Sequence, residues 1–375
     1  MAFKTNDTTR IDNDRKASLT NVAMPTTGVL EVNTVGGGGG GPLASPMQGT
    51  VKGLVAGGST NYGYQFDSAL NKVESFPFSN ESNVFLYSSL KVGTISSTGH
   101  SSTTDGYTVA GYTQIAPSTG NLTPGQPVYI DRHFLKSIDK IPFSAINVCT
   151  FVGNLSATRH LAGGHSSPTS GFVSGGAHLP SLLLVPLTSI ESFPFSTGSV
   201  ISSYVGDLGV ESYETATQSN ETHGFSCQNS NAPFVRTIVS RPGEVRIDRF
   251  PFSTSVTSTD IGDAIGNLYR AGISAPGPGF GYIAGYFESG VHLTGIQKYP
   301  FASGGFSAII GGLTQATSTN AGLSSSTNGY SIAGATNVPG GTTRIERFPF
   351  ATDNNSSYIG DISEARLSLN CSFQD

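Results

Sequence analysis

The 375-residue chain contains no tryptophan, only three cysteines and few charged residues, and each shortage narrows what the protein can be. Cys149, Cys227 and Cys371 are odd in number and widely separated, which excludes a disulfide framework and predicts ordinary buried thiols. Charged residues make up 12% of the chain, the net charge is −5, and Lys and Arg form no block. The sequence therefore lacks the basic stripe that nucleic-acid binding needs.

Long apolar runs are also missing. No stretch approaches the roughly 20 residues that cross a bilayer, and the opening MAFKTNDTTRIDNDRK has no apolar leader segment. We therefore expect neither membrane insertion nor a secretory signal.

The abundant residues are small: 48 Gly, 50 Ser and 38 Thr. Hydrophobic residues still form 37% of the chain, so it can bury a large core. This composition favours an all-β protein of many short strands joined by tight turns.

A repeated phrase, Val/Ile-x-x-aromatic-Pro-Phe, organises the chain from residue 51 onward. Its prolines are Pro77, Pro142, Pro194, Pro251, Pro300 and Pro349. Only the second copy replaces the aromatic residue, with Ile141. A period of about 50 residues is typical of repeat architectures.

Two further phrases stay in step with the prolines. A Gly-aromatic phrase or its Gly-Leu variant, typically ending in Ala-Gly or Gly-Gly, precedes them and starts at Gly53, Gly106, Gly171, Gly224, Gly281 and Gly329. A Val/Ile-Gly pair follows them, with its glycine at Gly93, Gly153, Gly206, Gly262, Gly311 and Gly360. Arg159, Arg270 and Arg366, each followed by small residues, mark a weaker fourth phrase. Each unit thus holds about four strands.

These patterns predict a six-bladed β-propeller over residues 51–375, because a radially repeated four-stranded sheet leaves only short, protected edges. A β-solenoid would need shorter repeats of about 20–30 residues, and tandem immunoglobulin-like domains would need about 100 residues each. We expect residues 366–373 to close the ring by pairing beside residues 51–57. We also expect the phenylalanine after each proline to be largely buried between neighbouring blades: Phe78, Phe143, Phe195, Phe252, Phe301 and Phe350.

The order of phrases, and above all Gly171-Phe-Val-Ser-Gly-Gly, resembles the kelch repeat over residues 51–375. The resemblance implies a kelch-like propeller. The chain departs from kelch in its last strand, where Val152-Gly-Asn-Leu and Val205-Gly-Asp-Leu stand in place of the kelch tryptophan.

Residues 1–50 lie outside the repeat and end in six glycines at 36–41, which predicts a polar anchoring arm with a flexible hinge. Its phrases Thr8-Thr-Arg-Ile-Asp-Asn-Asp-Arg15 and Ser18-Leu-Thr-Asn-Val22 resemble opening segments of tail-fibre and appendage proteins of marine cyanophage-like tailed bacteriophages. The resemblance implies a virion protein made in the host cytoplasm. The candidate anchor residues are Arg10, Ile11, Arg15, Leu19 and Val22. An ordinary exposed terminal tail is the alternative.

No pattern in the sequence indicates catalysis, a metal or a cofactor. His160 and His165 are five residues apart, a spacing that suits no ligand pair on one helix or strand face. The Asp boxes of sialidase-type propellers include tryptophan, which is absent. An acidic residue recurs one place after the Val/Ile of the proline phrase, at Glu74, Asp139, Glu191, Asp248 and Glu346. A symmetric acid is a structural feature, because a catalytic pair is unique.

The connections between the Gly-aromatic phrase and the proline phrase differ in length between units. They should all emerge on the same rim of the propeller. They are long at residues 114–137, 182–187 and 228–245, and such one-sided insertions often form a binding face. The candidate rim residues are Tyr129, Arg132, His133, Phe134, Leu183, Leu184, Phe234 and Arg236. The leucines have the alternative role of covering a blade edge.

We therefore expect a non-enzymatic virion component, a tail fibre or other appendage, that displays a propeller for host recognition. Its expected partners are other virion proteins, through the arm, and a glycan or protein of the host surface, within a homo- or hetero-oligomeric assembly. The alternatives are a carbohydrate-active or oxidase-like enzyme on a kelch-type disc, which would need converging Asp, His or Tyr side chains, and a free lectin-like binder.

Overall fold

The computed structural model describes residues 48–60, 69–81, 84–115, 131–181, 183–195, 200–229, 244–254, 257–266, 273–274, 279–369 and 371–375. The chain divides into two units, residues 1–43 and 44–375, and every described residue belongs to the second. The described residues form strands, turns and bends, with no helix among them. The prediction of an all-β chain is confirmed for this part of the protein.

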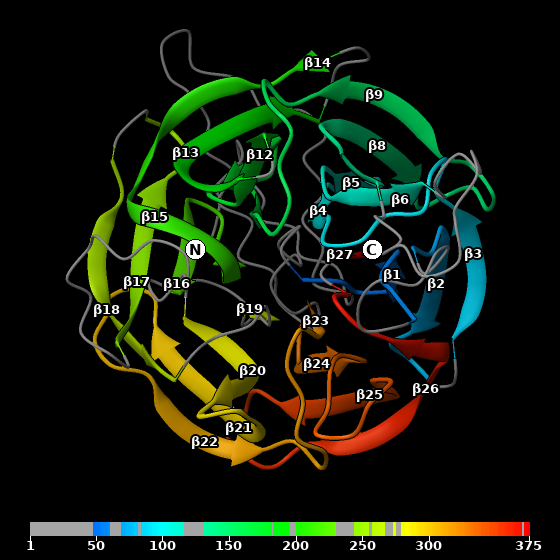
Figure 1. The fold of residues 1–375 in the computed structure, drawn as a ribbon. Coiled ribbons are helices and arrows are strands. Elements are labelled where there is room, and N and C mark those ends of the chain that lie inside the picture. Colours follow the sequence, from blue (N-terminus) through cyan, green and yellow to red (C-terminus); the bar gives the residue numbers. More distant parts are fainter. Residues whose placement is uncertain are drawn as a thin grey trace, which may run out of the picture. The chain divides into compact units, whose positions relative to one another are not determined.

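The strands form six four-stranded antiparallel arrays in chain order (Figure 1). Array 1 holds β27 (Cys371–Gln374), β1 (Lys52–Ala56), β2 (Lys72–Pro77) and β3 (Phe85–Ser89). Array 2 holds β4 (Thr98–Ser101), β5 (Asp105–Val109), β8 (Ser137–Pro142) and β9 (Thr150–Asn154). Array 3 holds β10 (Gly163–Ser166), β11 (Ser170–Ser174), β13 (Leu183–Pro194) and the first part of β15 (Ser203–Ser219).

Array 4 begins with the last part of β15, so this long strand joins arrays 3 and 4 into one sheet. It continues with β16 (His223–Asn229), β17 (Glu244–Pro251) and β18 (Thr259–Ile265). Array 5 holds β19 (Ile273–Ser274), β20 (Phe280–Glu288), β21 (Val291–Pro300) and β22 (Ala308–Gly312). Array 6 holds β23 (Ala321–Ser324), β24 (Asn328–Ile332), β25 (Thr342–Pro349) and β26 (Ser357–Arg366).

Four short strands are additions to these arrays. β6 (Tyr112–Ile115) pairs with β7 (Asp131–Phe134), and β12 (Ala177–Ser181) pairs with the start of β13. β14 (Val200–Ile201) lies parallel to β9.

Each sequence phrase occupies one strand position in its array. The glycine phrase lies in the second strand and the proline phrase in the third, and all six prolines end a third strand. Proline is suited to that place because it has no N–H to donate to a ladder. The expectation of about four strands per unit, with proline at a strand end, is confirmed.

The glycine that opens the second strand leaves room for an aromatic ring. Gly171 pairs with Phe193 of the third strand, and a Cβ at Gly171 would lie 2.3 Å from the Phe193 ring. The same contact recurs in the pairs Gly53–Phe76, Gly224–Phe250, Gly281–Tyr299 and Gly329–Phe348. In array 2, where Ile141 replaces the aromatic residue, the ring over Gly106 is Phe373 of array 1. Glycine is required here because any side chain would overlap the ring.

The phenylalanine after each proline contacts an aromatic ring of a neighbouring array. Five pairs have ring centroids 4.1–5.0 Å apart: Phe78–Tyr330, Phe195–Tyr107, Phe252–Phe172, Phe301–Phe225 and Phe350–Tyr282. Phe143 lies 6.4 Å from Phe373 in array 1. The prediction that these side chains are largely buried is right for Phe143 and Phe301. The other four are half-buried, because they pack at the margin of the core clusters rather than inside them.

Every fourth strand bulges opposite the Val or Ile of the proline phrase and the residue after it, which is an acid in five arrays and Gln297 in array 5. The bulge accounts for the Val/Ile-Gly pairs, in which the Val or Ile is the extra residue and the glycine resumes the pairing. Array 1 corrects the sequence interpretation. Val73 pairs with Ser88, eleven residues after its proline, so Ser88 holds the position assigned to Gly93, and Gly93 lies beyond β3.

The segment before each fourth strand donates a backbone hydrogen bond to the fourth strand of the preceding array. The six bonds are Val84–Asp361 (3.3 Å), Asn147–Tyr87 (3.0 Å), Ser202–Asn154 (3.0 Å), Ser258–Asp207 (2.8 Å), Ser307–Asp263 (2.9 Å) and Ser356–Gly312 (3.0 Å), with the N–H donor first. Each array thereby covers part of its neighbour's exposed edge, a position that otherwise invites pairing with another chain.

The chain end completes array 1, as predicted. β27 pairs antiparallel with β1, with Leu54 opposite Phe373 and Ala56 opposite Cys371. The pairing strand is Cys371–Gln374, shorter than the predicted 366–373, because Arg366 still belongs to β26. First strands contact one another from β27 to β4, β10, β15, β19, β23 and back to β27.

We predict that removing residues 371–375 lowers the thermal midpoint sharply, because β1 loses a partner and Phe143 loses its ring contact. Phe373→Ala alone should cost about 3–5 kcal/mol, since Phe373 is buried. Phe306→Ala is the control, because Phe306 is 80% exposed. Thermal unfolding followed by circular dichroism checks this. Equal midpoints for all the proteins would contradict the structural role of β27.

Candidate functional site

The connections between second and third strands all lie at one end of the arrays, which we call the rim end. Turns between first and second strands lie at the other end, the entry end, as antiparallel pairing requires. The rim connection is short in array 6, at residues 333–341, and long in array 2, at residues 110–136. The rim end is therefore where the arrays differ most.

The rim connection of array 2 begins and ends in the hairpin β6–β7. Tyr112 pairs with Phe134, and both rings contact His160, at centroid distances of 5.9 and 4.6 Å. Of the predicted rim residues, Phe134 is half-buried in this contact and His133 is exposed. Phe134 therefore anchors the hairpin, and His133 lies exposed on its surface.

The rim connection of array 3 is a second hairpin, formed by β12 and the start of β13. His160 links this second hairpin to the first. It forms a β-bridge with Ala177, and its Nδ1 lies 2.9 Å from the Ala177 oxygen. His178 lies 2.9 Å from the Thr158 hydroxyl. Leu183 and Leu184 belong to β13. The two hairpins thus stand side by side at the rim end.

Several predicted residues lie outside what the structure describes. Tyr129, Phe234 and Arg236 fall in undescribed parts of the rim connections, and only the backbone of Arg132, in β7, is described. The anchor residues Arg10, Ile11, Arg15, Leu19 and Val22 also lie outside the described residues.

The described chain starts at the entry end. Gly49 donates to the oxygen of Ser324 at 2.8 Å and bridges Ser325, in the turn between β23 and β24. Thr50 donates to the oxygen of Asp375, also at 2.8 Å. The described chain therefore begins at the end opposite the long rim connections.

Polar side chains of the first strands bond to the backbone of the next array. His100 Nδ1 lies 2.9 Å from the His165 oxygen, and His165 Nδ1 lies 3.1 Å from the Gln218 oxygen. Gln218, at the equivalent register, donates to the Tyr282 oxygen at 3.1 Å. Burial lowers the pKa of His100 to about 4, although the bond to His165 works in the opposite direction. These imidazoles are neutral at pH 7 and hold neighbouring arrays together.

One partly exposed position in each of five first strands carries a small residue. These residues are Gly99, Gly164, Thr217, Gly322 and Ser372. A Cβ at Gly99 would lie 2.1 Å from the Ser372 oxygen. The first strands thus approach too closely for larger side chains.

The recurrent acids also join arrays. Glu191 accepts hydrogen bonds from the Ser156 N–H (2.9 Å) and hydroxyl (2.7 Å), beyond the fourth strand of array 2, and pairs with buried Arg159. Burial alone would raise the pKa of Glu191, but Arg159 and the hydrogen bonds from Ser202 and Ser156 hold it below its ordinary value. Glu74 pairs with Arg366 in the same way.

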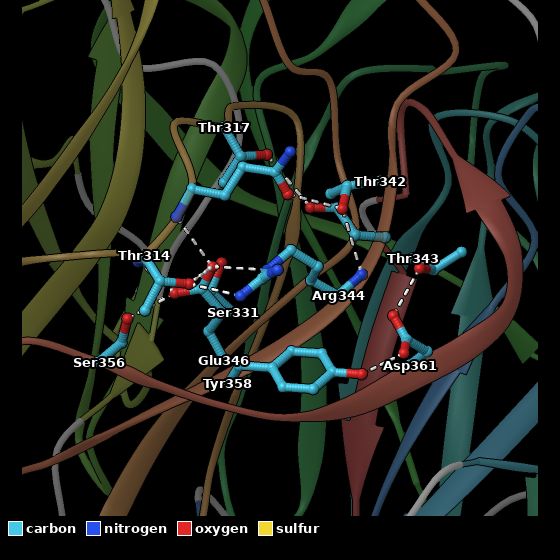
Figure 2. Close-up of polar contacts among 12 residues, drawn as sticks. Thr314, Thr317, Ser331, Thr342, Thr343, Arg344, Glu346, Ser356, Tyr358 and Asp361 are labelled. Carbon is cyan, nitrogen blue, oxygen red and sulfur yellow. Dashed lines mark hydrogen bonds and ion pairs between the residues drawn. The ribbon is translucent and has the colours of Figure 1, made fainter. Parts of the chain in front are cut away.

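Figure 2 shows the corresponding contacts of Glu346. Its carboxylate accepts from the Thr314 N–H at 2.6 Å and hydroxyl at 2.9 Å, and pairs with Arg344 of its own strand at 3.4 Å. In array 5 a neutral Gln297 replaces the acid and exchanges two 2.8 Å hydrogen bonds with the Ile265 backbone. The acid position therefore joins arrays whether or not it is charged.

Other candidate chemistry is limited in the described part of the chain. It holds no group of three or more His, Cys, Asp or Glu side chains arranged to bind a metal. Burial raises the pKa of Cys149 to about 11 and that of both Cys227 and Cys371 to about 12, so these thiols stay protonated. Among the same residues no helix has the length and apolar character to span a bilayer.

Comparison with models of known protein families and with curated proteins finds no match to this chain.

We predict that Glu191→Gln destabilises the protein by about 3–5 kcal/mol, because it leaves the guanidinium of Arg159 buried without a counter-charge. Adding Arg159→Met should recover much of the loss, since array 5 functions with an uncharged residue at this place. Denaturant unfolding measures both. If Glu191→Gln alone is as stable as the wild type, the ion pair contributes no net stability.

The buried histidines predict a loss of stability in mild acid. Burial lowers the pKa of His100 to about 4 and that of His165 to about 3, so the unfolded chain takes up protons first as the pH falls below about 6.5. The two histidines contribute fully to the free energy of unfolding above that pH. About 1–3 kcal/mol of this free energy should be lost between pH 7 and 5.5. The double variant His100→Gln/His165→Gln should lose less stability over this pH range. Glutamine is the residue that the chain itself has at the equivalent position, Gln218. Thermal midpoints across this pH range check it, and parallel curves would contradict it.

Proposed function

We propose that the six arrays are the blades of a β-propeller that serves as a non-enzymatic display module. Support for the propeller comes from three sets of contacts that each link array 1 to both array 2 and array 6: the aromatic pairs, the edge hydrogen bonds and the first-strand contacts. A solenoid would leave its two terminal units without such a link.

The display role rests on one observation, the separation of the two ends of the arrays. The chain joins them at the entry end, through Gly49 and Thr50, whereas the variable connections lie at the rim end. A module tethered by its amino-terminal segment would present the rim hairpins away from the tether. Loops on a rigid scaffold are common binding elements.

The virion assignment rests on the resemblance of the amino-terminal phrases to tail-fibre and appendage proteins. In this proposal the arm binds other virion proteins, and the rim, including His133, binds a glycan or protein of the host surface. The mature protein is then located in the virion.

The first strands favour this role over an enzyme on a kelch-type disc. Small residues bring neighbouring first strands close together, and His100 and His165 are engaged with backbone oxygens. These histidines therefore do not converge on a shared open site.

Two variants test the proposal with separate readouts. A chain without residues 1–41 should fold but be missing from gradient-purified phage particles analysed by mass spectrometry. A chain in which residues 116–130 are replaced by a short Gly-Ser turn should enter particles but bind host cells weakly. Phe306→Ala, at an exposed site outside the rim, is the control for both. Absence of the unaltered chain from particles would overturn the virion assignment, and normal binding by the rim variant would overturn the role of this hairpin.

A further inference from the structure

An apolar wall runs along the outer strands of arrays 1, 2 and 3. It consists of seven large side chains that are 38–77% exposed: Phe85, Leu86, Ile146, Val148, Phe151, Ile201 and Tyr204. They belong to β3, the segment before β9, β9 itself, β14 and the start of β15.

The wall is continuous because backbone contacts join its parts. Asn147, between Ile146 and Val148, donates to the Tyr87 oxygen of β3 at 3.0 Å. β14, which carries Ile201, pairs directly with β9, which carries Phe151. Side chains from three arrays therefore share one surface.

The fold does not require apolar residues at these positions. Leu86, Phe151 and Tyr204 pair with the recurrent acid of their own arrays. In array 4 the same register position holds Asp260, opposite Asp248. Exposed Ile309 in array 5 and exposed Tyr358 in array 6 occupy this position as well, so a large residue there is common to five arrays. Arrays 1–3 are distinguished by Phe85, Ile146, Val148 and Ile201, which extend these residues into one surface across three neighbouring arrays.

The wall also carries little charge. Residues 84–90, 144–155 and 200–206 contain no Asp, Glu, Lys or Arg, in a chain whose net charge is −5. Asp207 of β15 lies at one edge of the wall, where it accepts a hydrogen bond from the Tyr204 hydroxyl. The outer strand of array 5 is also uncharged, whereas that of array 4 carries Asp260 and Asp263 and that of array 6 carries Asp361. Away from Asp207, two copies could bring this surface together without opposing like charges.

We propose that the apolar wall is the contact between two copies of this chain in a symmetric dimer. The exposed area of the seven side chains is on the order of 700 Å², close to the roughly 800 Å² that each partner buries in a standard interface. A twofold axis pairs the same surface with itself, so an apolar wall with little charge is self-complementary. The proposal does not depend on the virion assignment.

Sedimentation velocity of the full chain over a range of concentrations tests the proposal. The unaltered chain should form dimers that persist at high salt, because apolar contacts are not screened. Phe151→Lys and Ile201→Lys should each raise the dimer dissociation constant about 100-fold or more, the effect expected at a central contact. The matched control is Ile309→Lys, which changes the same register position as Phe151 in array 5, outside the wall.

A monomeric chain at tens of micromolar would overturn the proposal, and so would dimers that survive both lysine substitutions. An Ile309→Lys variant that dissociates equally would also overturn it, because the contact would not be specific to the wall. The milder double variant Leu86→Ser/Phe151→Ser covers a folding defect in the lysine variants, and it should weaken the dimer while keeping the wild-type thermal midpoint. A wall variant that no longer dimerises but still enters particles normally would show that dimer formation and the proposed virion role are tested independently.

Discussion

The described part of this protein depends on one repeated contact, in which a phenylalanine of one array lies against an aromatic ring of its neighbour. Phe301 on Phe225 is the tightest example, with ring centroids 4.1 Å apart. Proline ends the third strand directly before this phenylalanine. In five arrays the aromatic residue before the proline lies over the glycine of the second strand, in the space of the missing Cβ. The proline and glycine phrases of the sequence therefore serve the aromatic packing within and between arrays.

Buried polar side chains also connect neighbouring arrays, and the charge of the buried acid is balanced differently from one array to the next. Glu191 and Glu74 are neutralised by Arg159 and Arg366 of the preceding array, whereas Glu346 is paired with Arg344 of its own strand. Gln297 avoids the charge altogether. All four side chains supply an oxygen that accepts a backbone N–H at or just beyond the fourth strand of the neighbouring array. A buried N–H group is costly to leave without a partner.

The regular joins leave three surfaces free to carry function. The described chain begins at the entry end, the rim end carries hairpins such as β6–β7, and the outer wall of arrays 1–3 is apolar with little charge. In the functions we propose, these surfaces serve attachment, recognition and self-association respectively. Each can change without disturbing the others, because the cores between arrays are built from different residues.

The sequence by itself determined the features that repeat. The all-β class, four strands per unit, proline at the third-strand end, and pairing of the last strand with the first all followed from the spacing of a few residue types. Spacing was insufficient where two segments distant in the sequence meet. Ser88 takes the position assigned to Gly93 because the bulge is set by pairing with Val73, and Phe134 is held by His160 rather than displayed. The wall of Phe85, Phe151 and Ile201 was not visible either, because only the tertiary structure brings three outer strands onto one surface.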